Sequence, residues 1–222
     1  MLNVDLSCKH KDVLEAIGNT PLMKLDFDIK PTLLAKLEYL SLGGSIKDRA
    51  ALFMIQEAER TGKLGPGGTI IEASSGNQGI ALAMIGAIKG YKVVITVPNR
   101  TSIEKISTLQ AYGAKVFVCP DTDDLNDPNG YHNKAETLHK QIENSYMPNQ
   151  YYNIENQKAH YLTTGPEIWK QSFGKLTHCF VGMGSCGTIS GVGKYLKEQN
   201  KNIKIIGIDA KTSKLSMPNS PK

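Results

Sequence analysis

Three loops in the sequence carry residue types that could bind a phosphorylated small molecule and react with it. In residues 43–49, GGSIKDR, two glycines permit a tight backbone path, and Asp48 falls in the first turn of an expected helix, where its charge suits the helix dipole. Lys47 is expected at this strand-to-helix corner, where a partly desolvated amine can have a lowered pKa and form a Schiff base. The segment also fits an ordinary surface lysine in the first turn of a helix.

The second loop, EASSGNQG at residues 72–79, lies between a strand-like apolar run and a helical pattern. Its hydroxyls, amide side chains and backbone N–H groups suit an anion, either a carboxylate or a phosphate. The alternative is a helix N-cap in which Ser or Asn closes the first turn. Taken by itself, this loop does not decide between the two.

The third loop, VGMGSCGT at residues 181–188, matches the pattern GxGxxG, and Asp209 follows Gly187 by 22 residues. That spacing is typical of a dinucleotide-binding site with an acid on the ribose, so a nucleotide-dependent oxidoreductase is one alternative. The same glycines and hydroxyls suit a cradle for any phosphate at a helix N-terminus. Cys186 in this loop is either a small buried residue or a reactive thiol.

These loops are positioned by an alternation of short apolar runs and longer amphipathic stretches, which is typical of βαβ units. The expected strands are residues 69–73, 92–97, 115–119, 178–182 and 203–209, preceded by strands at 18–25 and 33–38. The expected helices are residues 46–61, 77–89, 102–112, 133–144, 161–172 and 187–199. Strands that are apolar on both faces favour a mostly parallel sheet flanked by helices, so the expected fold class is α/β.

Two lobes are expected, each a mostly parallel sheet with helices on its faces. The division between them is expected after residue 150. The lobe that follows is expected to be incomplete, because residues 151–222 hold only three apolar elements before the polar ending KTSKLSMPNSPK. A segment this short is close to the lower limit at which a core stabilises itself.

Composition narrows the classes of function. The 222 residues are 40% hydrophobic and carry a net charge of +5, and only three of the 26 basic residues are Arg, so nucleic-acid binding is not indicated. No apolar run approaches the roughly 20 residues of a membrane span, and no signal peptide is recognisable, so a cytoplasmic location without a membrane partner is expected. The cysteines lack CxxC and metal-ligand spacing, so neither disulfides nor a metal site is expected. They are Cys8, Cys119, Cys179 and Cys186.

The three loops, together with three further segments, resemble the cysteine synthase and cystathionine β-synthase family of pyridoxal 5′-phosphate enzymes. The further segments are residues 17–22 (IGNTPL), 160–168 (HYLTTGPEI) and 205–209 (IIGID). The resemblance covers essentially the whole chain and implies a fold like that of tryptophan synthase β. In that fold residues 40–150 would form the smaller N-terminal α/β lobe, and residues 1–39 with 151–222 the larger lobe that holds the cofactor phosphate, here lacking its C-terminal part. It also implies a homodimer that performs β-replacement on serine or O-acetylserine with sulfide or a thiol, giving cysteine or cystathionine.

The resemblance assigns a role to each matching position. Lys47 corresponds to the lysine that binds the cofactor covalently, and Asn77 to the residue that contacts the 3′ oxygen of the cofactor. The residues implied to bind the substrate carboxylate are Ser74, Ser75, Gly76, Asn77 and Gln150. The residues implied to bind the cofactor phosphate are Gly184, Ser185, Cys186, Gly187 and Thr188.

Two departures from the family stand out. Cys186 replaces the glycine that the family usually has, and relatives continue beyond the segment that matches residues 209–222. A truncated, inactive scaffold that binds the cofactor or a partner protein is therefore a second alternative, from outside the enzymes.

Overall fold

The computed structural model describes residues 12–122, 124, 126–211 and 213, so that Cys8 lies outside the described residues. They form two compact units. The first comprises residues 12–21 and Leu37–Pro148, and the second comprises Leu22–Lys36 and the described residues from Asn149 onward. This division puts residues 12–21 in the first unit, whereas the sequence analysis assigned them to the larger lobe.

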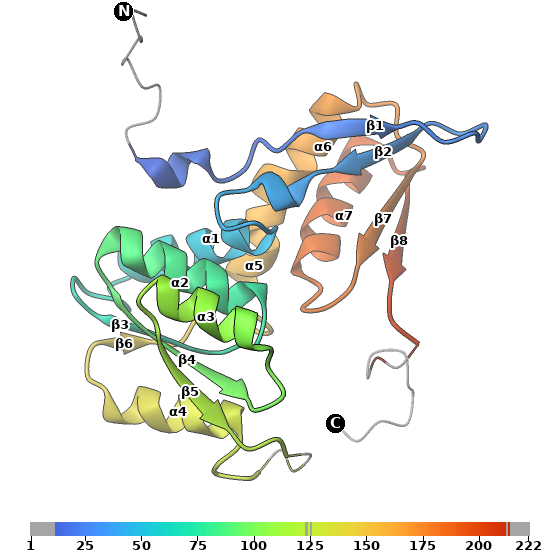
Figure 1. Cartoon of the computed structure of the whole chain (residues 1–222). Coiled ribbons are helices and arrows are strands. Elements are labelled where there is room, and N and C mark those ends of the chain that lie inside the picture. The colour runs from blue at the N-terminus through green and yellow to red at the C-terminus, as the bar shows by residue number, and fades with distance from the viewer. Residues whose placement is uncertain (1–11, 123, 125, 212, 214–222) are drawn as a thin grey trace, which may run out of the picture. The chain divides into compact units, whose positions relative to one another are not determined.

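The first unit is built around a four-stranded parallel sheet with the strand order β5-β4-β3-β6 (Figure 1). Its strands are β3 Thr69–Ala73, β4 Lys92–Pro98, β5 Lys115–Cys119 and β6 Ser145–Tyr146. Ile71 of β3 lies opposite Val94 of β4, and Thr96 of β4 lies opposite Phe117 of β5. Every residue of β3 is buried, as expected for a parallel strand with helices on both faces.

The two faces of this sheet carry separate hydrophobic cores. Because side chains alternate along a strand, Ile70 and Ile95 pack on one face with α1, α2 and α3. Ile71 and Val94 pack on the other face with Ala135 of α4, and Figure 1 shows α4 on the opposite side of the sheet from α2 and α3. The helices are α1 Lys47–Arg60, α2 Asn77–Lys89, α3 Ile103–Ala111 and α4 Tyr131–Gln141, with short 3-10 turns η1 Val13–Ala16 and η2 Glu38–Leu40.

The second unit contains two small sheets and a helical layer. Its strands are β1 Leu22–Leu25, β2 Leu33–Lys36, β7 His178–Gly182 and β8 Lys204–Ile208. Its helical segments are α5 Ile154–Ala159, the π-helical turn η3 His160–Thr164, α6 Gly165–Gln171 and α7 Gly187–Gln199. β1 and β2 pair in an antiparallel hairpin, while β7 and β8 are parallel and are connected through α7.

The core of the second unit lies between α6, α7 and the strands β7 and β8. Val192, Leu196 and Ile203 are fully buried there, and Trp169 packs against them. The helices approach closely, because a Cβ on Gly191 of α7 would lie only 2.3 Å from a backbone oxygen of α5. The start of α7 is therefore held firmly against α5.

The α/β class predicted from the sequence is confirmed, and so are the strands at 69–73, 115–119 and 178–182 and the helices at 77–89 and 187–199. The helix predicted at 161–172 is wrong in its start, since helical structure begins at Ile154 and passes through η3 before α6. β6 was missed, because its two residues show no periodicity.

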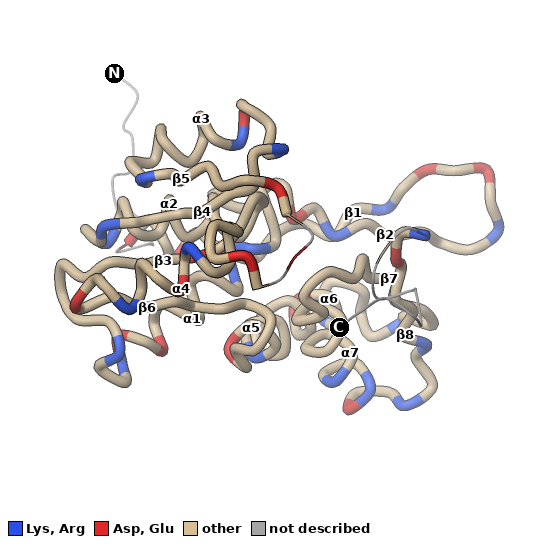
Figure 2. The backbone as a smooth tube through the Cα atoms, turned by 90° about the horizontal axis from the view of Figure 1, so that it is seen from below, with Lys and Arg blue, Asp and Glu red and all other residues tan. Residues whose placement is uncertain are grey.

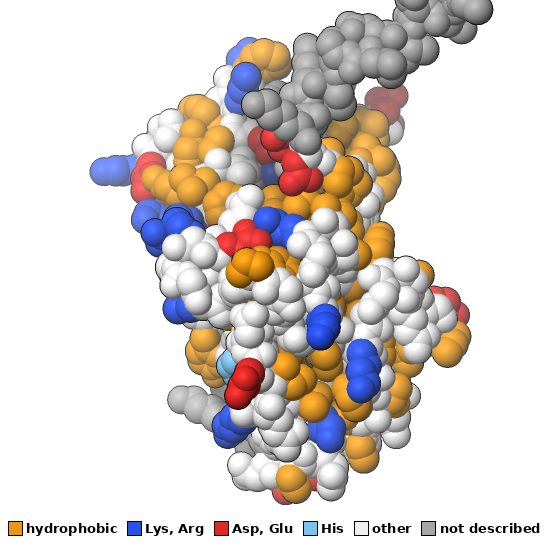
Figure 3. All heavy atoms as spheres, turned by 90° about the vertical axis from the view of Figure 1, so that its left-hand side faces the viewer, with side chains coloured by type: hydrophobic (Ala, Val, Ile, Leu, Met, Phe, Trp, Pro, Cys, Tyr) orange, Lys and Arg blue, Asp and Glu red, His pale blue; other side chains and the backbone are white. Residues whose placement is uncertain are grey.

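Basic and acidic residues are mixed along the described part of the chain. Lys and Arg are interspersed with Asp and Glu along both units (Figure 2), and hydrophobic side chains form separate patches among charged and other groups on the face drawn in Figure 3. In the described part of the chain, no helix is both long and apolar enough to cross a membrane, and no group of three or more His, Cys, Asp or Glu could hold a metal ion.

Candidate functional site

The loop before α1 places Lys47 through short backbone contacts. Gly43 N–H donates to Asp48 Oδ2 at 2.7 Å, and Lys47 N–H donates to Ser45 Oγ at 3.2 Å. Gly44 has a φ of +80°, a conformation that favours glycine. Lys47 is consequently the first residue of α1, but the element that precedes this loop is the 3-10 turn η2 and not a strand as predicted.

Asp48 fixes the shape of this loop from the buried side. A Cβ on Gly43 would lie 2.6 Å from Asp48 Oδ1, so the backbone can pass the carboxylate only as glycine. Burial raises the pKa of the Asp48 carboxyl, with a further rise from the negative charge of Glu38, while the Gly43 N–H opposes the rise. The side chain next to Lys47 is thus a carboxylate in an unfavourable environment.

Arg49 joins the start of α1 to two other segments of the first unit. Its guanidinium is 1% exposed and meets both carboxylate oxygens of Glu38, at 2.8 and 2.9 Å. Thr20 Oγ1 donates to Glu38 at 2.6 Å and accepts from Arg49 at 3.3 Å. The segment IGNTPL therefore has a structural role in this fold. Its threonine, Thr20, completes the hydrogen-bond network that anchors the Lys47 loop.

The loop between β3 and α2 uses Ser74 for the fold and leaves Asn77 exposed. Ser74 is buried, and its Oγ accepts the N–H of Gly79 at 3.1 Å. Within the described residues, the N–H groups of Ser75, Asn77 and Gln78 make no hydrogen bond. The N-cap of α2 is Gly76, which has no side chain to cap the helix, so Ser74 supports the loop from outside the cap position, and the N–H groups beside it can still meet an anion.

Gln78 is unusual in this loop. It is 2% exposed, and both its amide oxygen and its amide nitrogen are buried without a hydrogen-bond partner among the described residues. A buried amide left unpaired in this way destabilises the fold by an amount on the order of 1–3 kcal/mol.

The loop between β7 and α7 presents backbone N–H groups at the start of a 13-residue helix. Met183 N–H donates to the Ile208 carbonyl at 2.8 Å, which ties the loop to β8. Over the part of the chain that the structure describes, the N–H groups of Gly184, Gly187 and Thr188 make no hydrogen bond. Unpaired N–H groups and the positive end of a helix dipole favour a bound anion.

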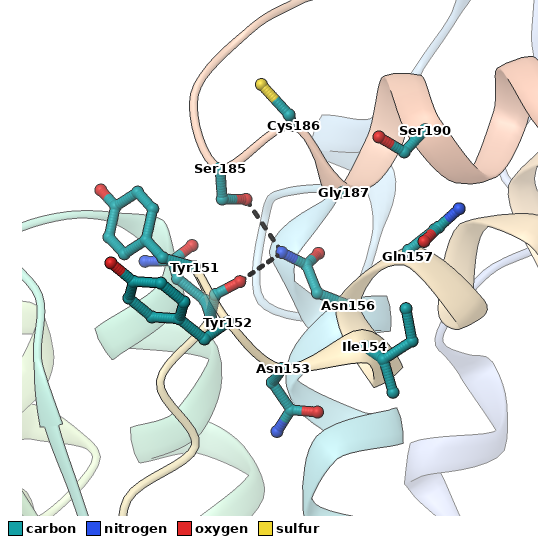
Figure 4. A pocket seen from close by; sticks show the side chains of 11 residues that line it. Tyr151, Tyr152, Asn153, Ile154, Asn156, Gln157, Ser185, Cys186, Gly187 and Ser190 are labelled. Atoms are coloured by element: carbon teal, nitrogen blue, oxygen red, sulfur yellow. Dashed lines mark hydrogen bonds between the residues drawn. The ribbon is translucent and has the colours of Figure 1, made fainter.

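Cys186 takes a backbone conformation that suits glycine better. Its φ is +61°, in the left-handed region, and it directly precedes α7. The thiol contacts the carbonyl oxygen of Gly184 at 3.7 Å, and Figure 4 shows it pointing away from Asn156. A cysteine is accommodated here because its side chain turns to the carbonyl side of the loop.

Gln150 lies at the edge of a pocket in the second unit. The pocket encloses about 180 Å³ that water can reach, between residues 150–157 and residues 185–190. Gln150 is 9% exposed, while Tyr151 and Tyr152 at the same edge are largely exposed. The pocket brings together Gln150, Ser185, Cys186 and Gly187 of the predicted set.

The predicted site residues thus fall into two groups. Lys47 and Asn77 begin α1 and α2, which pack against each other in the first unit, and Ser74, Ser75 and Gly76 precede α2. Gln150 and residues 184–188 lie in the second unit. Three residues that the sequence analysis did not single out bond to these groups or to the loops that carry them, namely Arg49, Asn156 and His160. In the sequence, the signal for them was their position in or next to the quoted motifs.

Several known proteins are similar to this chain. Cystathionine beta-synthase of Apis mellifera is 50% identical over 207 residues, which are 91% of this chain and 41% of the relative. Cysteine synthase B of Pseudomonas aeruginosa is 41% identical over 206 residues, 91% of this chain and 68% of the relative. A solved hydrogen sulfide-producing enzyme from Fusobacterium nucleatum has a TM-score of 0.86 and 41% identity, covering 95% of this chain and 68% of that one.

The chain therefore spans less than half of the first of these relatives and about two thirds of the other two. The family model described as "Pyridoxal-phosphate dependent enzyme" matches residues 13–218, which is most of the chain. The α/β fold agrees with that match. The chain belongs to the family of pyridoxal-phosphate dependent enzymes.

Proposed function

We propose that this protein performs pyridoxal-phosphate-dependent β-replacement on serine or O-acetylserine with a sulfur nucleophile, giving cysteine or cystathionine. Relatives named cystathionine beta-synthase and cysteine synthase support the reaction class. One structural observation carries the proposal, namely the group of unpaired N–H groups and the Thr188 hydroxyl at the start of α7.

The residues at the start of α7 fit the phosphate of the cofactor. A phosphate dianion needs several donors that converge on it, and Gly184, Gly187 and Thr188 supply N–H groups beside the hydroxyls of Ser185 and Thr188. A Cβ at position 184 would meet no atom within 4 Å, so one side of the loop is open. We assign the phosphate to residues 184–188, with Cys186 contributing its backbone.

Lys47 and Asn77 hold the reactive end of the cofactor in this proposal. As the resemblance implies, Lys47 would bind it covalently, and Asn77 would contact its 3′ oxygen. When bound, pyridoxal phosphate supplies a ring that disperses the negative charge left at the substrate Cα after proton loss. The Lys47 amine would accept that proton, and the buried network around Arg49 anchors the start of α1, to which Lys47 belongs.

The substrate carboxylate is assigned to the loop between β3 and α2 and to Gln150. Ser75, Gly76 and Asn77 offer a hydroxyl, a backbone N–H and an amide at the start of α2, where an anion is stabilised by the helix dipole. Ser74 shapes the loop through its bond to Gly79. We also propose, on the resemblance alone, that the working protein is a cytoplasmic homodimer.

Reduction with borohydride tests the covalent step. The chain is incubated with pyridoxal phosphate, reduced, digested and mapped, and the label is expected on Lys47, with the yellow absorbance lost in Lys47→Ala. Lys105→Ala is the matched control, because Lys105 is an exposed lysine in the first turn of α3. Label on another lysine, or on none, would refute the assignment.

Product analysis then tests the reaction. O-acetylserine with sulfide is expected to give cysteine if the protein is a cysteine synthase, and serine with homocysteine is expected to give cystathionine if it is a cystathionine synthase. Cofactor binding on Lys47 without either product would instead favour a cofactor-binding scaffold. Nicotinamide-cofactor binding by a colourless protein would favour the oxidoreductase.

A further inference from the structure

Asn156 makes an unusual set of contacts for a buried amide. It lies in α5, is 2% exposed, and its Nδ2 donates to the Gln150 carbonyl and to Ser185 Oγ, both at 2.9 Å (Figure 4). One nitrogen therefore links the segment before α5 to the loop that begins α7. Its Oδ1 is buried without a hydrogen-bond partner among the described residues.

Gly187 packs closely against the side chain of Asn156. A Cβ at position 187 would lie 2.1 Å from Asn156 Oδ1 and 2.3 Å from its Cγ, closer than any real contact. The Asn156 amide thus fills the space of a side chain at position 187. As long as Asn156 is present, position 187 is restricted to glycine, and the loop backbone is held against α5.

A second contact repeats this arrangement one helical turn later. His160 is fully buried, and its Nε2 lies 3.2 Å from Thr188 Oγ1 while its Nδ1 lies 3.0 Å from Thr164 Oγ1. Asn156 and His160 are four residues apart, so they lie on one side of the helical segment. The two hydroxyls at the start of α7 are therefore both held from α5 and η3.

We infer that Asn156 is a positioning residue for phosphate binding, which sets the direction of the Ser185 hydroxyl and the path of the backbone through Gly187. Because Ser185 Oγ accepts from Asn156, its own proton points away from the amide. A loop already held in its binding shape loses less entropy when an anion binds. This inference rests on the proposed function, since it takes residues 184–188 as the phosphate site.

The test compares two ligands that differ only in the phosphate. Dissociation constants are measured for pyridoxal phosphate and for pyridoxal with the chain and with Asn156→Ala, and folding is checked by thermal melting. The affinity of Asn156→Ala for pyridoxal phosphate is expected to fall about tenfold, the equivalent of one hydrogen bond, while that for pyridoxal stays within about twofold. Gln157→Ala is the matched control, because Gln157 lines the same pocket without a side-chain hydrogen bond in the described structure.

Asn156→Asp sharpens the result. It keeps the shape but loses the donor to Ser185 and adds a negative charge near the phosphate, so it is expected to weaken pyridoxal phosphate binding more than Asn156→Ala does. If Asn156→Ala unfolds the chain, Asn156→Asp is compared with and without Ser185→Ala, and its effect on pyridoxal phosphate binding is expected to shrink once the acceptor hydroxyl is gone. An equal loss for both ligands, or no loss, overturns the inference.

The packing is tested separately through Gly187→Ala. This variant is expected to melt at a lower temperature and to bind pyridoxal phosphate poorly, and adding Asn156→Ala is expected to restore part of the melting temperature because the overlapping atoms are gone. Absence of that recovery contradicts the fit between the two residues. If the unmodified chain binds both ligands equally, the proposed phosphate site fails, and this inference fails with it, whatever the melting data show.

Discussion

Replacing Arg49 with methionine should be far more costly than replacing another arginine of the same helix. Arg49 is 1% exposed, and its partner Glu38 is 14% exposed, so the pair is largely removed from water. Arg60, in the last turn of α1, pairs with Glu57 but is 72% exposed. The two residues therefore compare a buried and an exposed ion pair on one helix.

The size of the effect follows from what each change leaves behind. Arg49→Met removes two bonds to Glu38 and one to Thr20, and leaves the Glu38 carboxylate with the Thr20 hydroxyl in a poorly solvated place. Stranding one charge of a buried pair costs about 3–5 kcal/mol. Arg60→Met leaves Glu57 in water, so its cost is about 0–1 kcal/mol.

Urea unfolding followed by circular dichroism measures both variants against the unmodified chain, with the free energy of unfolding taken from the linear dependence on urea. Adding Glu38→Gln to Arg49→Met removes the stranded charge and is expected to recover part of the loss. If Arg49→Met destabilised the chain no more than Arg60→Met, the network could not be what anchors the Lys47 loop.

Three further changes have expected outcomes of their own. Cys186→Gly should raise the free energy of unfolding by roughly 0.5–1 kcal/mol in urea titrations. The reason is that the steric cost of a left-handed cysteine, which glycine does not have, exceeds the entropy that glycine adds to the unfolded chain. A loss of stability would contradict this. Gln78→Met should raise the free energy of unfolding by about 1 kcal/mol in the same assay, since it removes two unpaired buried groups at similar volume. A fall in that free energy by a similar amount would mean that the amide has a hydrogen-bond partner. Asp48→Asn tests the effect of pH. Burial raises the folded-state pKa of Asp48 above its ordinary 3.8, so the charged carboxylate disfavours folding near pH 7 and this penalty is lost as the pH falls through the raised pKa. The variant should therefore be at least as stable as the unmodified chain near pH 7, and the difference in free energy of unfolding between the two should shrink in acid; a difference that grows in acid would contradict the raised pKa.

Much of the fold could be predicted from local sequence patterns. β3, β5 and β7 are short runs that contain β-branched or aromatic residues and are followed or ended by Ser, Pro or Gly. α2 ends at Gly90, which takes the left-handed conformation. β6 could not be predicted, because Ser145 and Tyr146 become a strand only by pairing with Thr69 and Ile70.

The start of α5 was predictable but was missed. Asn153 accepts the N–H of Glu155 and so caps the helix, which the order Asn-Ile-Glu indicates. The sequence analysis placed only the boundary between two lobes here, after residue 150, and expected the next helix to begin at residue 161. η3 carries no local signal, since a π-helical turn depends on what packs around it.

The loops of the candidate site were predictable by residue type, but the side chains that hold them were not. Glycines and hydroxyls at strand-to-helix turns mark a place where an anion can bind, whatever surrounds it. The bonds from Arg49 to Glu38 and from Asn156 to Ser185 join residues 11 and 29 positions apart. Such pairs are set by tertiary packing, which periodicity does not record.

The five residues of η3 also have a consequence for how this region can change. Each residue of an α-helix turns the chain by about 100°, whereas η3 already closes its turn with the wider i→i+5 hydrogen bond of a π-helix, so inserting one further residue in His160–Thr164 would rotate α6 relative to α5. The bond from Asn156 to Ser185 and the packing of Trp169 on Val192, Leu196 and Ile203 could then not both be kept. An insertion in this segment should therefore cost more stability than a substitution at an exposed position within it.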